Sequence, residues 1–206
     1  MLGIRILEMK KLVLYVLFVV CSFVGHSQTN WELKKEDSGI QVYTRSIPSS
    51  TIKEYKATMV VNSTIEIVVE KIMTPNELKY WNYKITESKL LKKISSNELI
   101  IYMYNDFPWP IKDRDHISQL TLEQLNALTY KINIASLPNY LSLHHSAIRI
   151  DKFSGFWLIE NTAKGVKITQ QMHGEPKGHL PSAIINSTLT RAPFQTFKNL
   201  KHILTN

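Results

Sequence analysis

Six histidines lie beyond residue 27, and imidazole is a common general acid, general base and metal ligand near neutral pH. They are His116, His144, His145, His173, His179 and His202. The adjacent pair His144-His145 could hold one metal ion only from a loop, because neighbours along a strand point to opposite faces. A solvated loop is the simpler interpretation, so we predict no metal site.

The motifs of the common catalytic classes are missing from the sequence. It contains no Gly-x-Ser-x-Gly elbow, no phosphate-binding loop, no Gly-x-Gly-x-x-Gly and no His-Glu-x-x-His. The one cysteine is Cys21, which excludes an internal disulfide and a multi-cysteine zinc site. We therefore predict no catalytic residues and no cofactor.

The densest cluster of mixed charge is Asp113-Arg114-Asp115. Arg114 could bind the anionic group of a ligand while the two carboxylates orient it. The alternative is structural, with the three side chains closing the end of a strand and pairing with neighbouring charges.

Gln170 interrupts a strand face that is otherwise formed by Val166, Ile168 and Met172. An amide buried there without a partner would cost about 1–3 kcal/mol. Its partner could be a ligand hydroxyl, another side chain or a water molecule, and the sequence leaves these three open.

Length and composition limit the classes of protein that these residues could serve. The chain has 206 residues, of which 44% are hydrophobic and 20% charged, and its net charge is +8. This fits one globular domain with or without a processed segment, and it excludes a disordered chain. Lysine rather than arginine supplies most of the basic excess, although arginine is the residue that typically recognises phosphate and guanine. We expect a monomer with no nucleic-acid partner.

An apolar run of 13 residues, 12–24, follows two lysines near the N-terminus. A membrane-spanning helix needs about 20 apolar residues. A positive start, a short apolar core and small residues at Gly25 and Ser27 instead describe a secretory signal peptide.

We therefore predict that residues 1–27 are cleaved and that residues 28–206 form one domain. The mature chain would have 179 residues, a net charge of +6 and no cysteine, and it would be secreted or periplasmic. The alternative is a protein anchored in the membrane by an uncleaved N-terminal segment. Met9 is an alternative start.

Strand patterns dominate the remaining chain. Alternation and turn residues predict strands over 40–45, 52–61, 89–94, 98–105, 115–122, 128–136, 156–161 and 166–173. The segment Leu99–Tyr104 is apolar on both faces, which indicates a covered central strand. Ser63-Thr64-Ile65-Glu66 has the form of a capping box, and Thr74-Pro75 is typical of a second helix start.

Helical spacing replaces the strand pattern from Pro181 to Leu204. Pro193 lacks a backbone donor and is expected to kink or break this helix. An early helical pair, a sheet of many antiparallel strands and a long terminal helix together predict an α+β protein with helices on one sheet face.

Five short segments also occur in an informative order along the chain. They are Trp31 with Gly39–Arg45, Trp81, the stretch Phe107–Asp115 (FPWPIKDRD), Gly155-Phe156-Trp157, and Glu175–Pro181 followed by Asn186. Together they resemble the START domains, the steroidogenic-acute-regulatory-protein-related lipid-transfer family, from about Trp31 to Leu204.

The resemblance implies a helix-grip fold, in which a curved antiparallel β-sheet wraps around a long C-terminal α-helix and encloses an apolar cavity. It also implies non-catalytic binding, and possible transfer, of a lipid or other apolar small molecule. A few polar groups would fix the ligand's head. A moving loop or a tilt of the terminal helix would admit the ligand, and the basic surface would favour transient contact with membranes.

The ligand-binding residues that we predict on this basis lie along the cavity, with Arg114 at its mouth. They are Trp81, Tyr102, Tyr104, Arg114, Trp157, Gln170, Met172 and Ile184. Some family members pair a second, buried Arg with an acidic residue on the neighbouring strand. The corresponding stretch here, His116–Leu120, contains no Arg. The sequence therefore predicts neither a buried ion pair in the cavity nor a sterol-like ligand.

Two other classes of function stay open at this point. One is an enzyme of a related helix-grip family, cyclase-like or hydrolase-like. The other is a protein-interaction domain whose cavity is vestigial.

Overall fold

The computed structural model describes residues 30–107, 109–144, 146–178 and 180–205. The predicted signal peptide and Cys21 lie outside the described residues. The unit considered below begins at Trp31. None of the helices in the described ranges is long and apolar enough to cross a membrane.

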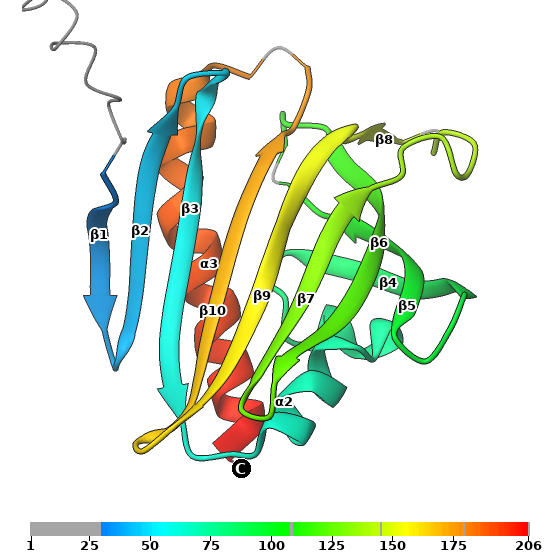
Figure 1. The fold of residues 1–206 in the computed structure, drawn as a ribbon. Helices are drawn as coiled ribbons and strands as arrows, with labels where there is room; N and C mark the ends of the chain where they lie inside the picture. Colours follow the sequence, from blue (N-terminus) through cyan, green and yellow to red (C-terminus); the bar gives the residue numbers. More distant parts are fainter. Residues whose placement is uncertain (1–29, 108, 145, 179, 206) are drawn as a thin grey trace, which may run out of the picture. The chain divides into compact units, whose positions relative to one another are not determined.

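A single curved sheet of ten strands forms most of this unit (Figure 1). Nine strands follow the order β1-β2-β3-β10-β9-β7-β6-β5-β4, and every neighbouring pair along this path is antiparallel. The tenth strand, β8, pairs with β6 in parallel. The strands are β1 (Glu32–Asp37), β2 (Ile40–Ile47), β3 (Ser50–Val61), β4 (Ile85–Lys93), β5 (Glu98–Asn105), β6 (Asp113–Asn126), β7 (Thr129–Ser136), β8 (Ala147–Arg149), β9 (Lys152–Thr162) and β10 (Gly165–Glu175).

The eight strands predicted from sequence correspond to β2–β7, β9 and β10, and two observed strands were not predicted. All six residues of β1 are exposed, so this strand carries no alternation of apolar and polar residues. A two-residue turn joins β1 to β2, where Ser38 and Gly39 have φ of 53° and 74°. Two successive positive φ values match the twist of a tight hairpin, which explains the glycine. The other strand, β8, has only three residues.

The early helical pair is present with one correction. Helix α2 (Ile65–Ile72) has Thr64 rather than Ser63 as its N-cap, because the Thr64 hydroxyl accepts a hydrogen bond from the Ile67 amide. The second element, η1 (Pro75–Tyr80), is a 3-10 helix with proline at its first position. It ends at Tyr80, and the next residue, Trp81, is buried in the core.

The terminal helix α3 (Ser182–Thr205) runs without interruption through Pro193, so the expected break does not occur. Proline removes only one helical hydrogen bond, and its buried ring packs into the interior of the protein. The Asn186 side chain ties the start of α3 to β3, accepting from the Lys53 amide at 2.8 Å and donating to the Thr51 carbonyl at 3.1 Å.

Figure 1 shows α3 lying along one face of the curved sheet, and buried residues of the sheet and of the helices together form the core. The Trp157 ring stacks on Phe197 of α3 at 5.6 Å between centroids and meets the edge of Trp81 at 6.0 Å. Gly155 lies beside Trp157 on β9, where a Cβ would stand only 2.1 Å from the Gln171 carbonyl oxygen. The glycine of the Gly-Phe-Trp segment is therefore required for the close approach of β9 and β10.

Candidate functional site

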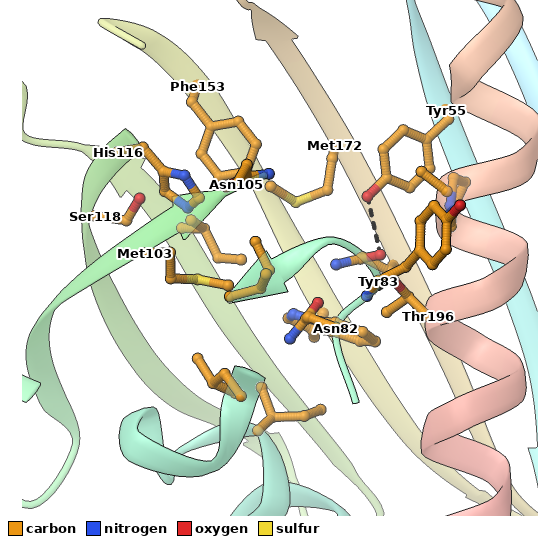
Figure 2. A pocket seen from close by; sticks show the side chains of 18 of the residues that line it. Tyr55, Asn82, Tyr83, Met103, Asn105, His116, Ser118, Phe153, Met172 and Thr196 are labelled. Atoms are coloured by element: carbon orange, nitrogen blue, oxygen red, sulfur yellow. Dashed lines mark hydrogen bonds between the residues drawn. The ribbon is translucent and has the colours of Figure 1, made fainter. Parts of the chain in front are cut away.

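The interior contains a hollow of about 190 Å³, which we call the deep cavity. Its lining comes from the end of α2, from η1 and the residues that follow it, from the inner faces of β3–β7, β9 and β10, and from the middle of α3. The lining residues include Tyr55, Trp81, Ile101, Met103, Asn105, His116, Ser118, Ile134, Phe153, Trp157, Gln170, Met172, Leu189, Ala192 and Thr196. Figure 2 shows several of these side chains converging on the space.

A second hollow of about 260 Å³, the mouth cavity, adjoins the deep cavity. The two share six lining residues, which are Tyr55, Ile150, Phe153, Met172, Thr188 and Leu189. The mouth cavity is bounded further by Phe107 and Ile111 of the β5–β6 loop, by Pro176 and Leu180 after β10, and by Ile184 of α3. Two loops and the start of the terminal helix therefore frame its outer side.

Neither hollow presents an ionised side chain. Among the described residues, no Asp, Glu, Lys or Arg lines the deep cavity or the mouth cavity. Charged groups begin at a third hollow, the rim recess, where Lys84, Asp106 and Arg191 are exposed. The interior thus suits an apolar molecule, because such a molecule is stabilised by leaving water at roughly 25 cal/mol per Å² buried.

Gln170 has a partner inside the protein. The Tyr55 hydroxyl donates a hydrogen bond to the Gln170 Oε1 at 3.0 Å (dashed in Figure 2). Burial raises the pKa of Tyr55, which keeps the phenol protonated and able to donate. The sequence left a ligand hydroxyl, another side chain and a water molecule open as the partner of Gln170, and the structure shows a side chain, that of Tyr55.

Four other polar atoms at the cavity do not have such partners. The Trp81 Nε1, Asn105 Oδ1, His116 Nδ1 and Ser118 Oγ are all buried and make no hydrogen bond within the described part of the chain. His116 and Ser118 point to the same face of β6, and Asn105 lies at the end of the neighbouring strand β5. Burial lowers the pKa of His116 to about 4, so its ring is neutral at pH 7 and offers one donor and one acceptor.

Arg114 is a structural tie between loops. Its guanidinium donates to the carbonyl oxygens of Pro176 at 3.1 Å and Lys177 at 3.0 Å, and also to that of Lys112. Only 2% of the residue is exposed, and it lines none of the hollows described above. The structure thus places Arg114 beside the mouth, holding together the two loops that frame it, rather than facing a ligand.

The acidic neighbours of Arg114 face away from the cavity. Asp113 accepts hydrogen bonds from the Phe107 amide at 2.8 Å and the Tyr104 hydroxyl at 2.7 Å, and these bonds lower its pKa. Asp115 forms a buried two-pronged ion pair with Arg149, with both N–O distances at 2.8 Å. A buried ion pair therefore exists, but it lies on the opposite face of the sheet from the cavity. Asp115 and Arg149 line a separate recess there together with Tyr102, and none of the three lines the deep cavity.

The cavity predictions for Tyr102 and Tyr104 are wrong in position. On β5 the residues Ile101 and Met103 line the deep cavity, so the intervening tyrosines face the other side of the sheet. Tyr102 packs there with Ile100 and Ile117, against the partly buried Leu137.

The other predicted residues lie at the hollows. Trp81, Trp157, Gln170 and Met172 line the deep cavity, and Ile184 lines the mouth cavity. Their contact with a ligand stays a prediction. Sequence reasoning missed Asn105, His116 and Ser118, although the shared parity of His116, Ser118 and the buried Leu120 was a usable signal.

The metal-site question can be followed only for the histidines that the structure describes. His144 lies exposed and close to Ser146, and His145 is outside the described residues. Among the residues with described positions, no group of three or more His, Cys, Asp or Glu side chains could hold a metal ion.

Comparison with known proteins agrees with this geometry. The profile of the START domain matches residues 20–206. A protein of Pseudomonas aeruginosa whose function is uncharacterised is 30% identical over 176 residues, covering 84% of this chain and 85% of that protein. The rat phosphatidylcholine transfer protein is 26% identical over 164 residues, covering 76% of this chain and 75% of that protein.

Solved structures show the same fold. A STAR-related lipid transfer protein of Xanthomonas axonopodis superposes with a TM-score of 0.79 at 32% identity, covering 84% of this chain and 98% of that one. An aromatase/cyclase from Streptomyces superposes with a TM-score of 0.50 at 10% identity, covering 73% of this chain and 90% of that one. The second likeness concerns the fold alone.

Proposed function

The chain belongs to the START domain family, and from this membership and its cavity we propose that it binds a lipid or other apolar small molecule without chemical change. The single observation that carries the proposal is the pair of adjoining hollows, lined by apolar side chains and by no ionised group among the described residues. Transfer between membranes is the further role that its relatives suggest, since the rat protein and the Xanthomonas protein are both named for lipid transfer.

The residues that the structure describes contain no proton relay at the cavity, which supports binding rather than catalysis. His116 is the imidazole that lines the deep cavity, and its ring contacts Phe153 at 4.7 Å between centroids. Asp115, its neighbour in sequence, is paired with Arg149 on the other face of the sheet. A general base needs a substrate within reach and an orienting partner, and the second is missing among the described residues.

Lipid extraction from vesicles tests this function. The protein is incubated with vesicles of mixed lipids and re-isolated by size, and its organic extract is identified by mass spectrometry. We expect lipid to co-elute with the protein at an unchanged mass. Protein that carries no lipid from any vesicle would contradict binding, and a modified product would favour an enzyme.

Contact with membranes is proposed to involve Trp109, which is 92% exposed between two residues, Phe107 and Ile111, that line the mouth cavity. Tryptophan favours the membrane interface because its ring is apolar and its N–H is polar. Burying roughly 60 Å² of the ring at about 25 cal/mol per Å² is worth about 1.5 kcal/mol, which is roughly tenfold in affinity.

Trp109→Ser should therefore weaken binding to anionic vesicles by roughly tenfold without changing the melting temperature, as measured by co-sedimentation and thermal unfolding. Leu128→Ser is the matched control, because Leu128 is also exposed, at 54%, but lines none of the hollows. Equal vesicle binding by the wild type and both variants would show that the membrane is contacted elsewhere.

We also propose that the chain is exported. The support is the sequence of residues 1–27, with two lysines, a short apolar run and small residues before the expected cut. Expression with the complete N-terminus should yield an exported protein whose first residue is Gln28, as read by N-terminal sequencing. A product that begins at Met1 or Met9 and stays with the membrane would identify an anchor instead.

A further inference from the structure

The polar side chains of β5 and β6 in the deep cavity indicate what kind of head group its ligand carries. We propose that the cavity selects lipids whose buried polar group is an uncharged hydroxyl or carbonyl, and that His116 and Ser118 hydrogen-bond that group. This inference rests on the proposed binding function and specifies its ligand class.

The first support is the set of polar atoms that have no partner. The His116 Nδ1 and Ser118 Oγ are buried without a hydrogen bond among the described residues, as is the Asn105 Oδ1 nearby. His116 is 4% exposed and Ser118 is 0% exposed. Buried polar atoms are normally partnered because an unpaired one loses its hydration and gains nothing in return. The Trp81 Nε1 is a fourth such atom at this hollow, but the three on β5 and β6 share one face of the sheet, which indicates that a polar group of the ligand binds beside them (Figure 2).

The chemistry of these atoms fits a small uncharged group. The neutral imidazole and the hydroxyl each offer a donor and an acceptor, so together they can pair with a hydroxyl or a carbonyl. A water molecule could occupy the place when the cavity is empty. A ligand group that reproduces its hydrogen bonds can displace that water without loss of affinity.

The second support is the lack of a countercharge. A phosphate or ammonium group beside His116 would be buried with no ionised side chain around it, since none lines either cavity in the described part of the protein. The nearest guanidinium on the same strand, Arg114, is already bonded to three carbonyl oxygens. Burying an unpaired ion is far more costly than burying a neutral polar group.

A lipid with a phosphate head would have to keep that head outside, at the rim recess where Lys84 and Arg191 lie. Its chain would then fill the cavity and leave the His116 and Ser118 atoms unpaired. A lipid with an uncharged head therefore uses the His116 and Ser118 side chains, whereas a lipid with a phosphate head does not. Two ligands that share one alkyl chain and differ only in the head can distinguish these cases.

The test compares tetradecan-1-ol with tetradecylphosphocholine, which share one alkyl chain and differ in the head. Both are used below their aggregation concentrations to displace the uncharged dye Nile red from the full chain. We expect the alcohol to displace the dye at a concentration at least about tenfold lower than the phosphocholine does. Ser118→Ala and His116→Phe should each reduce that preference by about fivefold to tenfold.

Thr44→Val is the matched control, because the Thr44 hydroxyl is also buried without a partner but lines none of the hollows. It should leave the preference unchanged. Ser118→Ala should keep or raise the melting temperature of the empty protein, since it removes an unsatisfied atom, and this outcome separates ligand recognition from a structural role.

Each remaining result counts against the inference in a distinguishable way. Equal or tighter displacement by the phosphocholine would overturn the head-group inference and leave lipid binding intact. A lower melting temperature of Ser118→Ala with an unchanged preference would show that the hydroxyl is structural. Failure of both ligands, and of Nile red itself, to bind would overturn the proposed function together with the inference.

Discussion

Replacing Arg149 by methionine should lower the free energy of unfolding by about 3–5 kcal/mol, because it leaves a buried carboxylate without its partner. Asp115 is 0% exposed, and Arg149 donates to both of its oxygens. Arg149 also donates to the carbonyl oxygens of Pro138, Leu141 and Ser142, so the variant frees the segment that covers the outer face of the sheet. Urea unfolding measures the change.

Two controls separate the buried charge from the loss of a salt bridge in general. Lys152→Met removes an ion pair with Glu175 whose lysine is 69% exposed, and exposed pairs of this kind contribute at most about 1 kcal/mol. Combining Arg149→Met with Asp115→Asn removes the unpaired charge and should recover part of the lost stability. A loss of under about 1 kcal/mol in Arg149→Met alone would contradict the assignment of a structural ion pair.

The largest functional effect is expected from Ala192→Trp. Ala192 lies on α3 and lines both the deep cavity and the rim recess, so an indole there would occupy the space of a ligand chain. Each methylene group kept out of the cavity costs about 0.8 kcal/mol of binding free energy. Exclusion of four methylene groups would weaken binding by about 3 kcal/mol, which is on the order of 100-fold. Titration with Nile red or a fluorescent fatty alcohol measures the change.

Lys198→Trp is the control for the new side chain, because Lys198 is exposed on the same helix and lines none of the hollows. It should bind the probe as the wild type does. Unaltered affinity in an Ala192→Trp protein with a wild-type melting temperature would place the ligand outside the deep cavity.

The architecture could be predicted from sequence where the spacing of apolar residues fits only one kind of element. Alternation over 40–45 and 52–61 located a hairpin, and the spacing of Phe197, Leu200 and Leu204 located the buried face of α3. A break at Pro193, one of the two outcomes predicted from the lost hydrogen bond, does not occur. The ring of Pro193 is buried, and burial of apolar surface offsets the loss of one hydrogen bond.

The site was harder to predict because a covered strand hides its direction. Every residue from Leu99 to Met103 is buried, so hydrophobicity does not tell which side of β5 faces the cavity. The prediction that Tyr102 and Tyr104 line the cavity therefore took residues from the outer face of β5. A shift of one residue along a strand reverses which side chains face the cavity. Which side of β5 faces inward becomes clear only from its pairing with β6, where Met103 lies opposite His116.

Polar residues of the cavity were missed for a related reason. A histidine and a serine in a sequence suggest catalysis or solvent exposure. His116 and Ser118 are instead buried, because they lie on the face of β6 that is turned toward the core. Gln170 could be identified because it stood alone on an apolar face, whereas its partner Tyr55 lies 115 residues away along the chain.

Native mass spectrometry of the protein purified from cells tests the central claim most directly. We predict that the wild-type chain carries a mass excess equal to one lipid and loses it on gentle activation. The Ala192→Trp protein should be purified without this excess. Wild-type protein that is empty and takes up no lipid on incubation, or an Ala192→Trp protein that retains the same excess, would contradict binding in the cavity.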